Sequence, residues 1–137
     1  MLMSPPAPPA LLLNHPIRTW FGIGGGAGRY CIPAGIDHLK QCLDFDPALR
    51  VLGDGANLLV DDEGVRELVV ELTHPEFTAW TLNDSTGEAR VGAGANLPKL
   101  INESVRRGLA GIETLAGIPA TLGGALIMNA GGTFGQI

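Results

Sequence analysis

The chain has 137 residues, of which 45% are apolar and 17% are charged, and its net charge is −5 at neutral pH. This composition excludes an intrinsically disordered segment, and the length fits one domain better than two. The nine Lys and Arg residues are scattered rather than clustered, which argues against nucleic acid as a partner.

Residues 1–17 are rich in proline, and we expect an extended, poorly ordered lead-in there. This segment has no basic stretch at its start, and its apolar run from Leu11 to Leu13 is too short for a secretion signal or a membrane span. We therefore expect a cytoplasmic protein without a membrane partner, whose ordered domain covers residues 18–137.

The predicted elements of the first half are short. The aromatic and β-branched residues of Arg29 to Pro33 indicate a strand. A helix is expected from Asp37 to Leu43, with Asp37 as its N-cap. Three further strands are predicted, the last with one buried face, over Arg50 to Leu52, Leu58 to Val60 and Arg66 to Leu72.

The second half contains the strongest helix signal. Ala79 to Leu82 and Ala89 to Gly92 flank a turn-rich stretch and predict a hairpin. Apolar residues then recur at helical spacing from Leu97 to Val105, with Asn96 as N-cap and Gly108 as the stop. Strands mixed with two helices, without a regular βαβ repeat, indicate an α+β or α/β fold rather than a doubly wound sheet.

The cysteines and histidines show no ligand pattern in the sequence. Cys31 and Cys42 lack C-x-x-C spacing and have no clustered histidines, so buried free thiols and no metal site are predicted. His15, His38 and His74 are far apart, and we expect surface or capping roles.

Two glycine-rich loops carry the functional signal. Residues lacking a Cβ let successive backbone N–H groups approach phosphate oxygens, and Gly53 to Asn57 and Gly117 to Ala125 both have this composition. Together they can clamp both phosphates of a dinucleotide. Glycine pairs are also common at turns, so either loop alone can be structural. Neither matches the Rossmann fingerprint or the P-loop.

Three motifs in order resemble one enzyme family. Leu52 to Val60 is similar to the LGxGSNxLV loop of the UDP-N-acetylenolpyruvoylglucosamine reductase (MurB) family, also called UDP-N-acetylmuramate dehydrogenase. Gly108 to Gly131 resembles the GLxGxExLxGIPGTxGGAxxMNAG block of that family, and Thr19 to Gly25 resembles its T-[WF]-x-x-GG element. The resemblance covers residues 18–137.

The resemblance implies a fold and a reaction. It implies an α+β FAD-binding domain of the PCMH or vanillyl-alcohol-oxidase type, in which two small α+β subdomains surround the flavin. Members use NADPH to reduce FAD, and the hydride then reduces UDP-N-acetylglucosamine enolpyruvate to UDP-N-acetylmuramate for peptidoglycan. A UDP-sugar is the expected partner and a monomer the expected state, while the choice between NADPH and NADH stays open.

The same resemblance assigns the cofactor-binding residues to two groups. The first group is Leu52, Gly53, Gly55, Ala56, Asn57 and Leu58. The second group is Gly117, Ile118, Pro119, Ala120, Thr121, Gly124, Asn129, Ala130 and Gly131. For Glu113, the only charge from Gly108 to Gly135, we favour a role in fixing loop amides over a role as a base.

Departures from the family pattern modify this expectation. Ala120 stands where the family has glycine, which costs about 1 kcal/mol if the position needs a positive φ. Ala56 replaces a serine, with a similar loss of about 1 kcal/mol if its hydroxyl bonds phosphate. If either condition holds, FAD binding is weakened but not abolished.

The catalytic residues of the family are expected after Ile137. Its Tyr-Arg-x-Ser element, proton-donating serine and C-terminal glutamate follow the part that this chain matches, so we expect no catalytic residue here and no turnover by this chain alone. Two alternatives remain open: another FAD-dependent oxidase or dehydrogenase of the same wide group, and a non-catalytic fragment of that fold.

Overall fold

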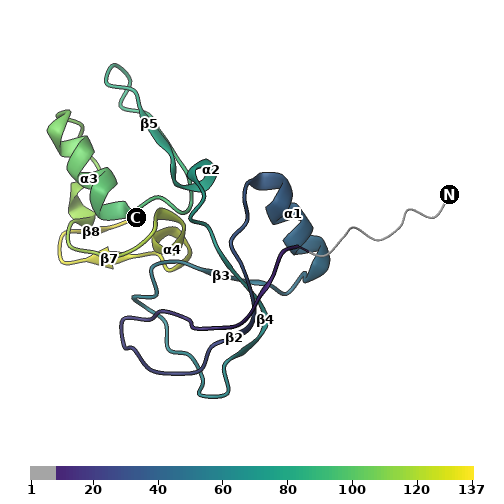
Figure 1. The fold of residues 1–137 in the computed structure, drawn as a ribbon. Coiled ribbons are helices and arrows are strands. Elements are labelled where there is room, and N and C mark those ends of the chain that lie inside the picture. The colour runs from purple at the N-terminus through teal and green to yellow at the C-terminus, as the bar shows by residue number, and fades with distance from the viewer. Residues whose placement is uncertain (1–8) are drawn as a thin grey trace. The chain divides into compact units, whose positions relative to one another are not determined.

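The computed structural model describes residues 9–137, and the chain divides after His74 into two compact units (Figure 1). The first unit is built on a four-stranded sheet, and the second on short strands and helices around a core of its own. This mixture confirms the α+β class.

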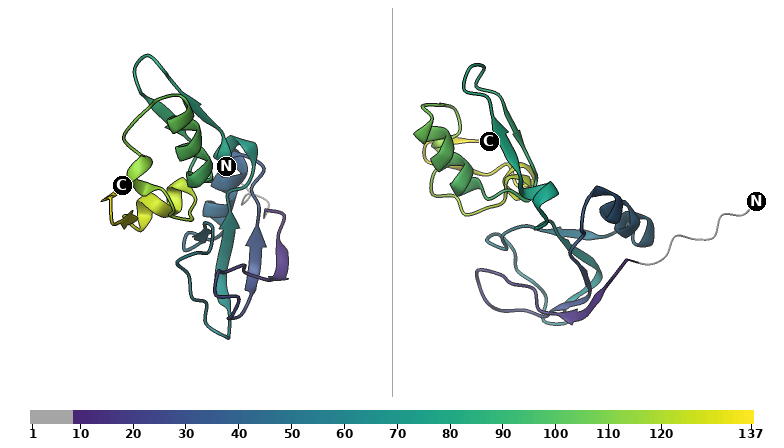
Figure 2. Two further views of the ribbon diagram at one scale, coloured as in Figure 1. Left: turned by 90° about the vertical axis from the view of Figure 1, so that its left-hand side faces the viewer. Right: turned by 45° about the horizontal axis from the view of Figure 1, so that its top comes forward.

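A mixed sheet organises the first unit, with strand order β1-β2-β4-β3. Strand β1 (Leu12–His15) pairs antiparallel with β2 (Ala27–Cys31). Both β2 and β3 (Arg50–Leu52) pair parallel with β4 (Val65–Glu71), and β2 and β4 lie side by side in Figure 2. Helix α1 (Ile36–Phe45) connects β2 to β3.

Strand β4 is buried on both faces because a core cluster packs against each face of it. Val69 packs into one core cluster, while Leu68 and Val70 pack into another on the opposite face, with Cys42 of α1. All three β4 residues have 3% or less of their surface exposed. The prediction of a strand is confirmed, and the prediction of a single buried face is wrong.

The start of the sheet lies in the segment expected to be poorly ordered. Residues 12–15 form β1, whose register pairs Leu12 with Tyr30 and His15 with Ala27. Tertiary pairing therefore orders this stretch, and the prediction does not hold for these residues. Residues 1–8 of the predicted lead-in lie outside the described residues.

Two local predictions in the first unit need correction. Helix α1 is present, but Gly35 is its N-cap residue and no side chain caps it; the Asp37 carboxylate lies 2.8 Å from Lys40 Nζ instead. Residues 58–60 form no strand. Leu58 packs on the first core and Val60 is buried, so this segment packs as a loop without a pairing partner.

The second unit contains the predicted hairpin and helix. Strands β5 (Trp80–Leu82) and β6 (Ala89–Val91) pair antiparallel, as predicted. The remaining elements, in chain order with the 3-10 turn η1, are α2 (Pro75–Thr78), α3 (Leu97–Arg106), η1 (Glu113–Leu115), α4 (Leu122–Ile127), β7 (Gly131–Gly132) and β8 (Gly135–Gln136).

Helix α3 follows the sequence pattern closely. The Asn96 side chain accepts a hydrogen bond from Lys99 N at 3.0 Å, which is the predicted N-cap. Gly108 has a φ of +71° just after the helix, as a glycine stop requires. The apolar face of the helix forms the core with η1 and α4, through Leu97, Ile101, Leu115 and Ala125.

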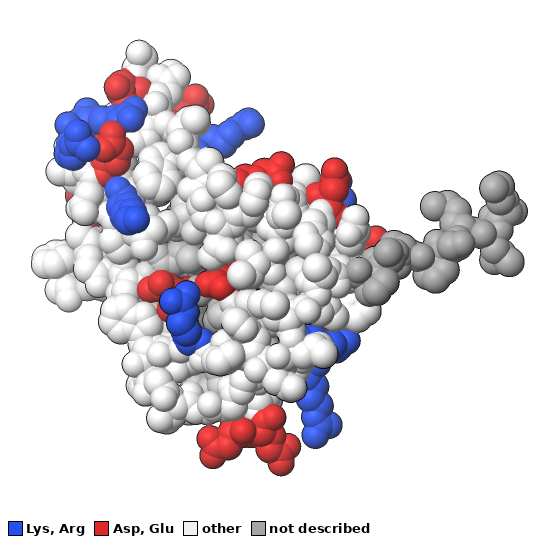
Figure 3. Space-filling model, viewed as in Figure 1, with Lys and Arg blue, Asp and Glu red and all other residues white. Residues whose placement is uncertain are grey.

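The surface agrees with the scattered charge seen in the sequence. On the face shown in Figure 3, acidic and basic side chains form small groups, some mixed and some of one sign, separated by uncharged surface. Among the described residues, no helix combines the length and the apolar character needed to cross a bilayer.

Candidate functional site

The first glycine loop, residues 53–57, follows β3 and is held against the segment that contains Thr19 and Trp20. Trp20 N donates to Gly55 O at 3.0 Å. Gly55 has a φ of +70°, and a Cβ on it would lie 2.3 Å from Arg18 O. Only glycine allows this backbone approach.

The segment that contains Thr19 and Trp20 and the segment that contains the first loop are also in contact closer to their C-terminal ends. Gly25 N donates to Asp61 O at 2.9 Å. A Cβ on Gly24, whose φ is +100°, would lie 2.3 Å from Val60 O. The structure therefore brings together two of the three motifs singled out in the sequence, Thr19 to Gly25 and Leu52 to Val60.

The first loop presents backbone donors that the fold itself does not use. Within the described part of the chain, the N–H groups of Asp54, Gly55, Ala56 and Asn57 donate no hydrogen bond, while the Gly55 carbonyl is occupied. Successive free amides in a tight loop form a concave donor set that suits an anion. The site residues of the first group are contiguous here.

A hollow of about 260 Å³ adjoins this loop, and its lining residues are Arg18, Thr19, Trp20, Leu52, Gly53, Asp54 and Glu71. The Arg18 guanidinium lies 3.7 Å from the Glu71 carboxylate. The Tyr30 hydroxyl donates to Glu71, and burial together with this carboxylate raises the pKa of Tyr30. Tyr30 thus stays a neutral donor that holds Glu71 in place.

Five of the lining residues were not among the predicted site residues: Arg18, Thr19, Trp20, Asp54 and Glu71. A signal was available for Glu71, because the carboxyl ends of parallel strands meet at one edge of a sheet. Leu52 at the end of β3 is paired with Glu71 at the end of β4. Trp20 belongs to the N-terminal motif and Arg18 directly precedes it, and the sequence did not connect this segment to the glycine loop.

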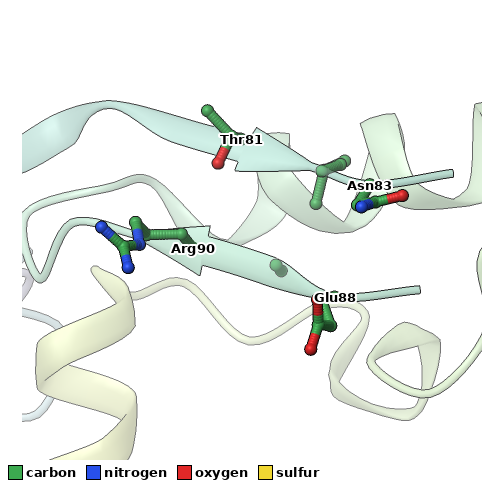
Figure 4. A pocket seen from close by; sticks show the side chains of 6 residues that line it. Thr81, Asn83, Glu88 and Arg90 are labelled. Carbon is green, nitrogen blue, oxygen red and sulfur yellow. The ribbon is translucent and has the colours of Figure 1, made fainter. Parts of the chain in front are cut away.

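A second hollow, of about 500 Å³, lies along the β5–β6 hairpin (Figure 4). The labelled side chains Thr81, Asn83, Glu88 and Arg90 come from that one hairpin. None of the residues predicted from the sequence lines it. We assign no site to it.

The second glycine loop, in the other unit, uses its amides differently. Leu122 N donates to Ala95 O and Gly123 N to Ala93 O, both at 2.8 Å. Gly124 N donates to the Thr121 hydroxyl at 3.2 Å. The expected run of free donors is therefore absent at residues 122–124, where the amides hold α4 against its own unit.

Several second-group residues contribute to the core of that unit. Ile118, Ala120 and Ala130 pack against the core cluster. Ala120 has no positive φ, and its carbonyl accepts from Leu97 N at 3.0 Å. The expected strain at Ala120 is therefore absent.

The rest of the second group flanks α4. Thr121 is the N-cap residue of that helix. Gly117 has a φ of +88°, and Asn129 has a φ of +46°, an uncommon conformation for a residue other than glycine. The structure thus gathers Gly117, Ile118, Pro119, Ala120, Thr121, Gly124, Asn129, Ala130 and Gly131 around one short helix.

Glu113 has the predicted anchoring role. Its carboxylate accepts a hydrogen bond from Gly111 N. Backbone N–H donation from Glu113 itself and from Gly111 lowers the pKa of this carboxyl. The carboxylate fixes loop amides, as the sequence indicated.

Cys31 and Cys42 are buried free thiols, as predicted, and they lie in a cluster with His38 that the sequence spacing did not indicate. The fold brings the side chains of Cys31, His38 and Cys42 together, with their potential ligand atoms within 4.8 Å of one another. Helix α1 folds back on β2, which sequence spacing alone does not reveal.

Comparisons with known proteins agree with these motifs. Residues 34–137 match the family model described as FAD binding domain. The chain is 44% identical over 119 residues to a UDP-N-acetylenolpyruvoylglucosamine reductase of Thermus thermophilus, covering 87% of this chain and 42% of that protein. It is 49% identical over 118 residues to reductase 2 of Symbiobacterium thermophilum, covering 82% of this chain and 37% of that protein.

A solved structure shows the same similarity. The crystal structure of UDP-N-acetylenolpyruvylglucosamine reductase from Thermus caldophilus matches with a TM-score of 0.67 and 42% identity, over 82% of this chain and 40% of that one. The chain thus spans about two fifths of the length of such relatives. It belongs to the FAD binding domain family, and it corresponds to the N-terminal FAD-binding portion of the UDP-N-acetylenolpyruvoylglucosamine reductases.

Proposed function

We propose that this chain is the FAD-binding part of an NADPH-dependent reductase that converts UDP-N-acetylenolpyruvoylglucosamine to UDP-N-acetylmuramate in peptidoglycan synthesis. One observation carries the proposal. The two motifs of the first unit meet around residues 54–57, whose backbone N–H groups are free. The similarity to reductases of two thermophilic bacteria supports the choice of reaction.

The first unit fits a pyrophosphate through its main chain. Gly55 allows the loop to turn tightly, and the amides of residues 54–57 can donate to phosphate oxygens without a lysine. Among the residues that line the hollow, Arg18 is the only cation, and 89% of its side chain is exposed. It can therefore turn toward a bound anion at little structural cost.

We propose that the second-group residues position FAD rather than neutralise the charge of its phosphates. The amides at the start of α4 are already paired, whereas the N–H groups of Gly117, Ala120 and Thr121 donate nowhere in the described chain. Asn129, held in a left-handed conformation, turns the chain after α4. When bound, FAD would supply hydride transfer, and these residues would hold and orient the cofactor.

We assign neither proton donation nor binding of the hydride-accepting substrate to this chain. Reduction of an enolpyruvyl group needs a positioned acid and stabilisation of developing negative charge. None of the matched residues is assigned these roles, and we propose that the chain does not turn over by itself. We further propose a monomeric cytoplasmic enzyme whose remaining part binds the UDP-sugar.

A flavin titration tests the first half of the proposal. The 137-residue chain is mixed with FAD, and the unbound flavin is separated by gel filtration. We expect flavin to elute with the protein and riboflavin to bind more weakly, because riboflavin lacks the pyrophosphate. Equal binding of FAD and riboflavin would contradict the assigned role of the loop.

A chimera tests the reaction. The chain is joined to the downstream part of the Thermus thermophilus reductase, which is 44% identical to it in the shared region. We expect oxidation of NADPH that depends on UDP-N-acetylenolpyruvoylglucosamine, with the intact relative as the positive control. A chimera that binds FAD yet oxidises a hydroxy acid or alcohol instead would support an oxidase of the wider group.

A further inference from the structure

Three soft donor side chains meet on the α1 side of the sheet, in the first unit. Cys31 ends β2, while His38 and Cys42 are four residues apart on α1 and so share one face of the helix. Cys31 Sγ lies 3.6 Å from Cys42 Sγ and 3.7 Å from His38 Nε2. The motifs that match the reductases lie elsewhere in the sequence.

These distances match those between ligands of one tetrahedral ion. With metal–sulfur bonds of about 2.3 Å and metal–nitrogen bonds of about 2.0 Å, tetrahedral zinc places two sulfurs about 3.8 Å apart and sulfur and nitrogen about 3.5 Å apart. All three ligand atoms lie within 4.8 Å of one another. Small side-chain adjustments are therefore sufficient to complete the site.

We propose that Cys31, His38 and Cys42 bind a zinc ion, with a water molecule as the fourth ligand. Two thiolates and an imidazole are the donor types that zinc prefers, and no fourth His, Cys, Asp or Glu joins the cluster in the described residues. Both thiols are buried, with 1% and 0% of the residue exposed, whereas His38 is half-buried. The ion thus enters past His38.

Binding exchanges protons in a balanced way. The metal displaces one proton from each thiol, and both are released to solvent. In the metal-free chain Ala34 N donates to His38 Nδ1 at 3.1 Å, so the ring proton lies on Nε2 and points to Cys31 Sγ. Ligation through Nε2 moves that proton to Nδ1 and breaks the bond to the exposed Ala34. The contacts that link Ala34 N to His38, His38 to Cys31 and Cys42 to Cys31 are thus exchanged for three metal bonds.

The ion would join α1 to β2 and stabilise the first unit. Cys31 and Cys42 already belong to one core cluster with Leu68 and Val70 of β4. A ligand that binds only the folded arrangement raises the midpoint of unfolding. The same thiols are also close enough to be oxidised to a disulfide, so the test keeps them reduced.

Cobalt is the probe, because thiolate ligation of Co²⁺ is visible directly. The stripped 137-residue chain, reduced with a phosphine under argon, is titrated with Co²⁺ and then with Zn²⁺. We expect one Co²⁺ per chain, a thiolate-to-cobalt charge-transfer band, the visible bands of a four-coordinate ion, and their loss when Zn²⁺ is added. Absence of the charge-transfer band while both thiols remain titratable would overturn the proposal.

His38→Ala is the main variant, because His38 is half-buried and its removal leaves both thiols in the core. We expect Co²⁺ affinity to fall at least about tenfold, with the far-UV circular dichroism unchanged. The matched control His74→Ala should bind like the parent chain. Unchanged affinity in His38→Ala, or a disulfide that forms readily while the reduced chain binds no metal, would also refute the site.

Discussion

The two glycine-rich loops have similar composition but use their backbone amides in opposite ways. Residues 54–57 leave their N–H groups unpaired, next to a hollow, while residues 122–124 donate to Ala93, Ala95 and Thr121 of their own unit. Glycine marks a close backbone approach in both loops. In the second loop, the amides donate to groups of the same unit. In the first loop, the close approach leaves the amides free to donate to a ligand.

Glycine content therefore predicts tight packing more reliably than it predicts a ligand. A Cβ on Gly123 would lie 2.9 Å from the Cβ of Ala93, so that glycine is needed for the fold alone. A Cβ on Gly55 would also clash, with Arg18 O, yet the amides of that loop stay free. Variants in each loop separate the two roles.

The largest effect is expected for Gly55→Ala. The added Cβ meets Arg18 O at 2.3 Å in a left-handed backbone, so the loop and the segment before Trp20 must separate. We expect FAD affinity to fall at least about tenfold and the free energy of unfolding to fall by about 1–3 kcal/mol. Flavin titration and urea unfolding measure both quantities.

Gly22→Ala is its matched control. Gly22 also has a positive φ, +65°, but nothing lies within 4 Å of an added Cβ. It should lose about 1 kcal/mol of stability through backbone strain, with little change in FAD affinity. If both variants lost FAD affinity equally, the close approach to Arg18 O would not explain why FAD binding requires glycine at position 55.

Thr121→Ala tests whether the second loop is structural. Its hydroxyl accepts from Gly124 N as the N-cap of α4, so we expect a loss of about 1 kcal/mol in unfolding free energy. Thr121→Ser should retain most of that stability. A large loss of FAD affinity in Thr121→Ala without any loss of stability would show that the hydroxyl contacts the ligand instead.

Ala56→Ser and Ala120→Gly restore the residues typical of the related reductases. The serine hydroxyl adds a donor beside free amides, and we expect FAD to bind more tightly by about 1 kcal/mol, or about fivefold. Ala120→Gly should give no such gain, because Ala120 has no positive φ to relieve. Competitive titration of the two variants compares them, and the reverse order would contradict this account.

The smallest effect is expected at low pH, in the first unit. The pKa of Asp46 is lowered, mainly by the hydrogen bond from Leu68 N at 2.9 Å and also by Ala48 N and Arg29. Its stabilisation is full above the ordinary pKa of 3.8 and is lost as the pH falls through the lower folded value. Asp46→Asn should therefore lose less stability than the parent between pH 5 and pH 3. Thermal unfolding at both pH values checks this.

Local signals predicted much of the fold. The apolar stripe and Asn96 identified α3, and the turn-rich stretch identified the β5–β6 hairpin, because their contacts are close in sequence. Strand β1 was missed because its order depends on pairing with β2. Leu58 to Val60 were predicted as a strand, although no strand of residues 9–137 pairs with them.

The sequence motifs of the site were predictable, but the residues that surround the loop in space were not. The sequence identified the loop at residues 53–57, yet Arg18 and Glu71 joined it only through the contact with Trp20 and the parallel register of β3 and β4. Likewise, Cys31 and Cys42 meet because α1 folds over the sheet. Such contacts depend on tertiary packing, which spacing does not encode.

The most direct test of the central claim follows the backbone amides of the first loop by NMR. The ¹⁵N-labelled chain is titrated with FAD, and chemical shifts and hydrogen exchange are recorded for every assigned amide. We expect the amides of residues 54–57 to shift and their exchange to slow, with riboflavin producing much smaller changes. Saturating FAD that leaves these four amides unchanged would contradict the account.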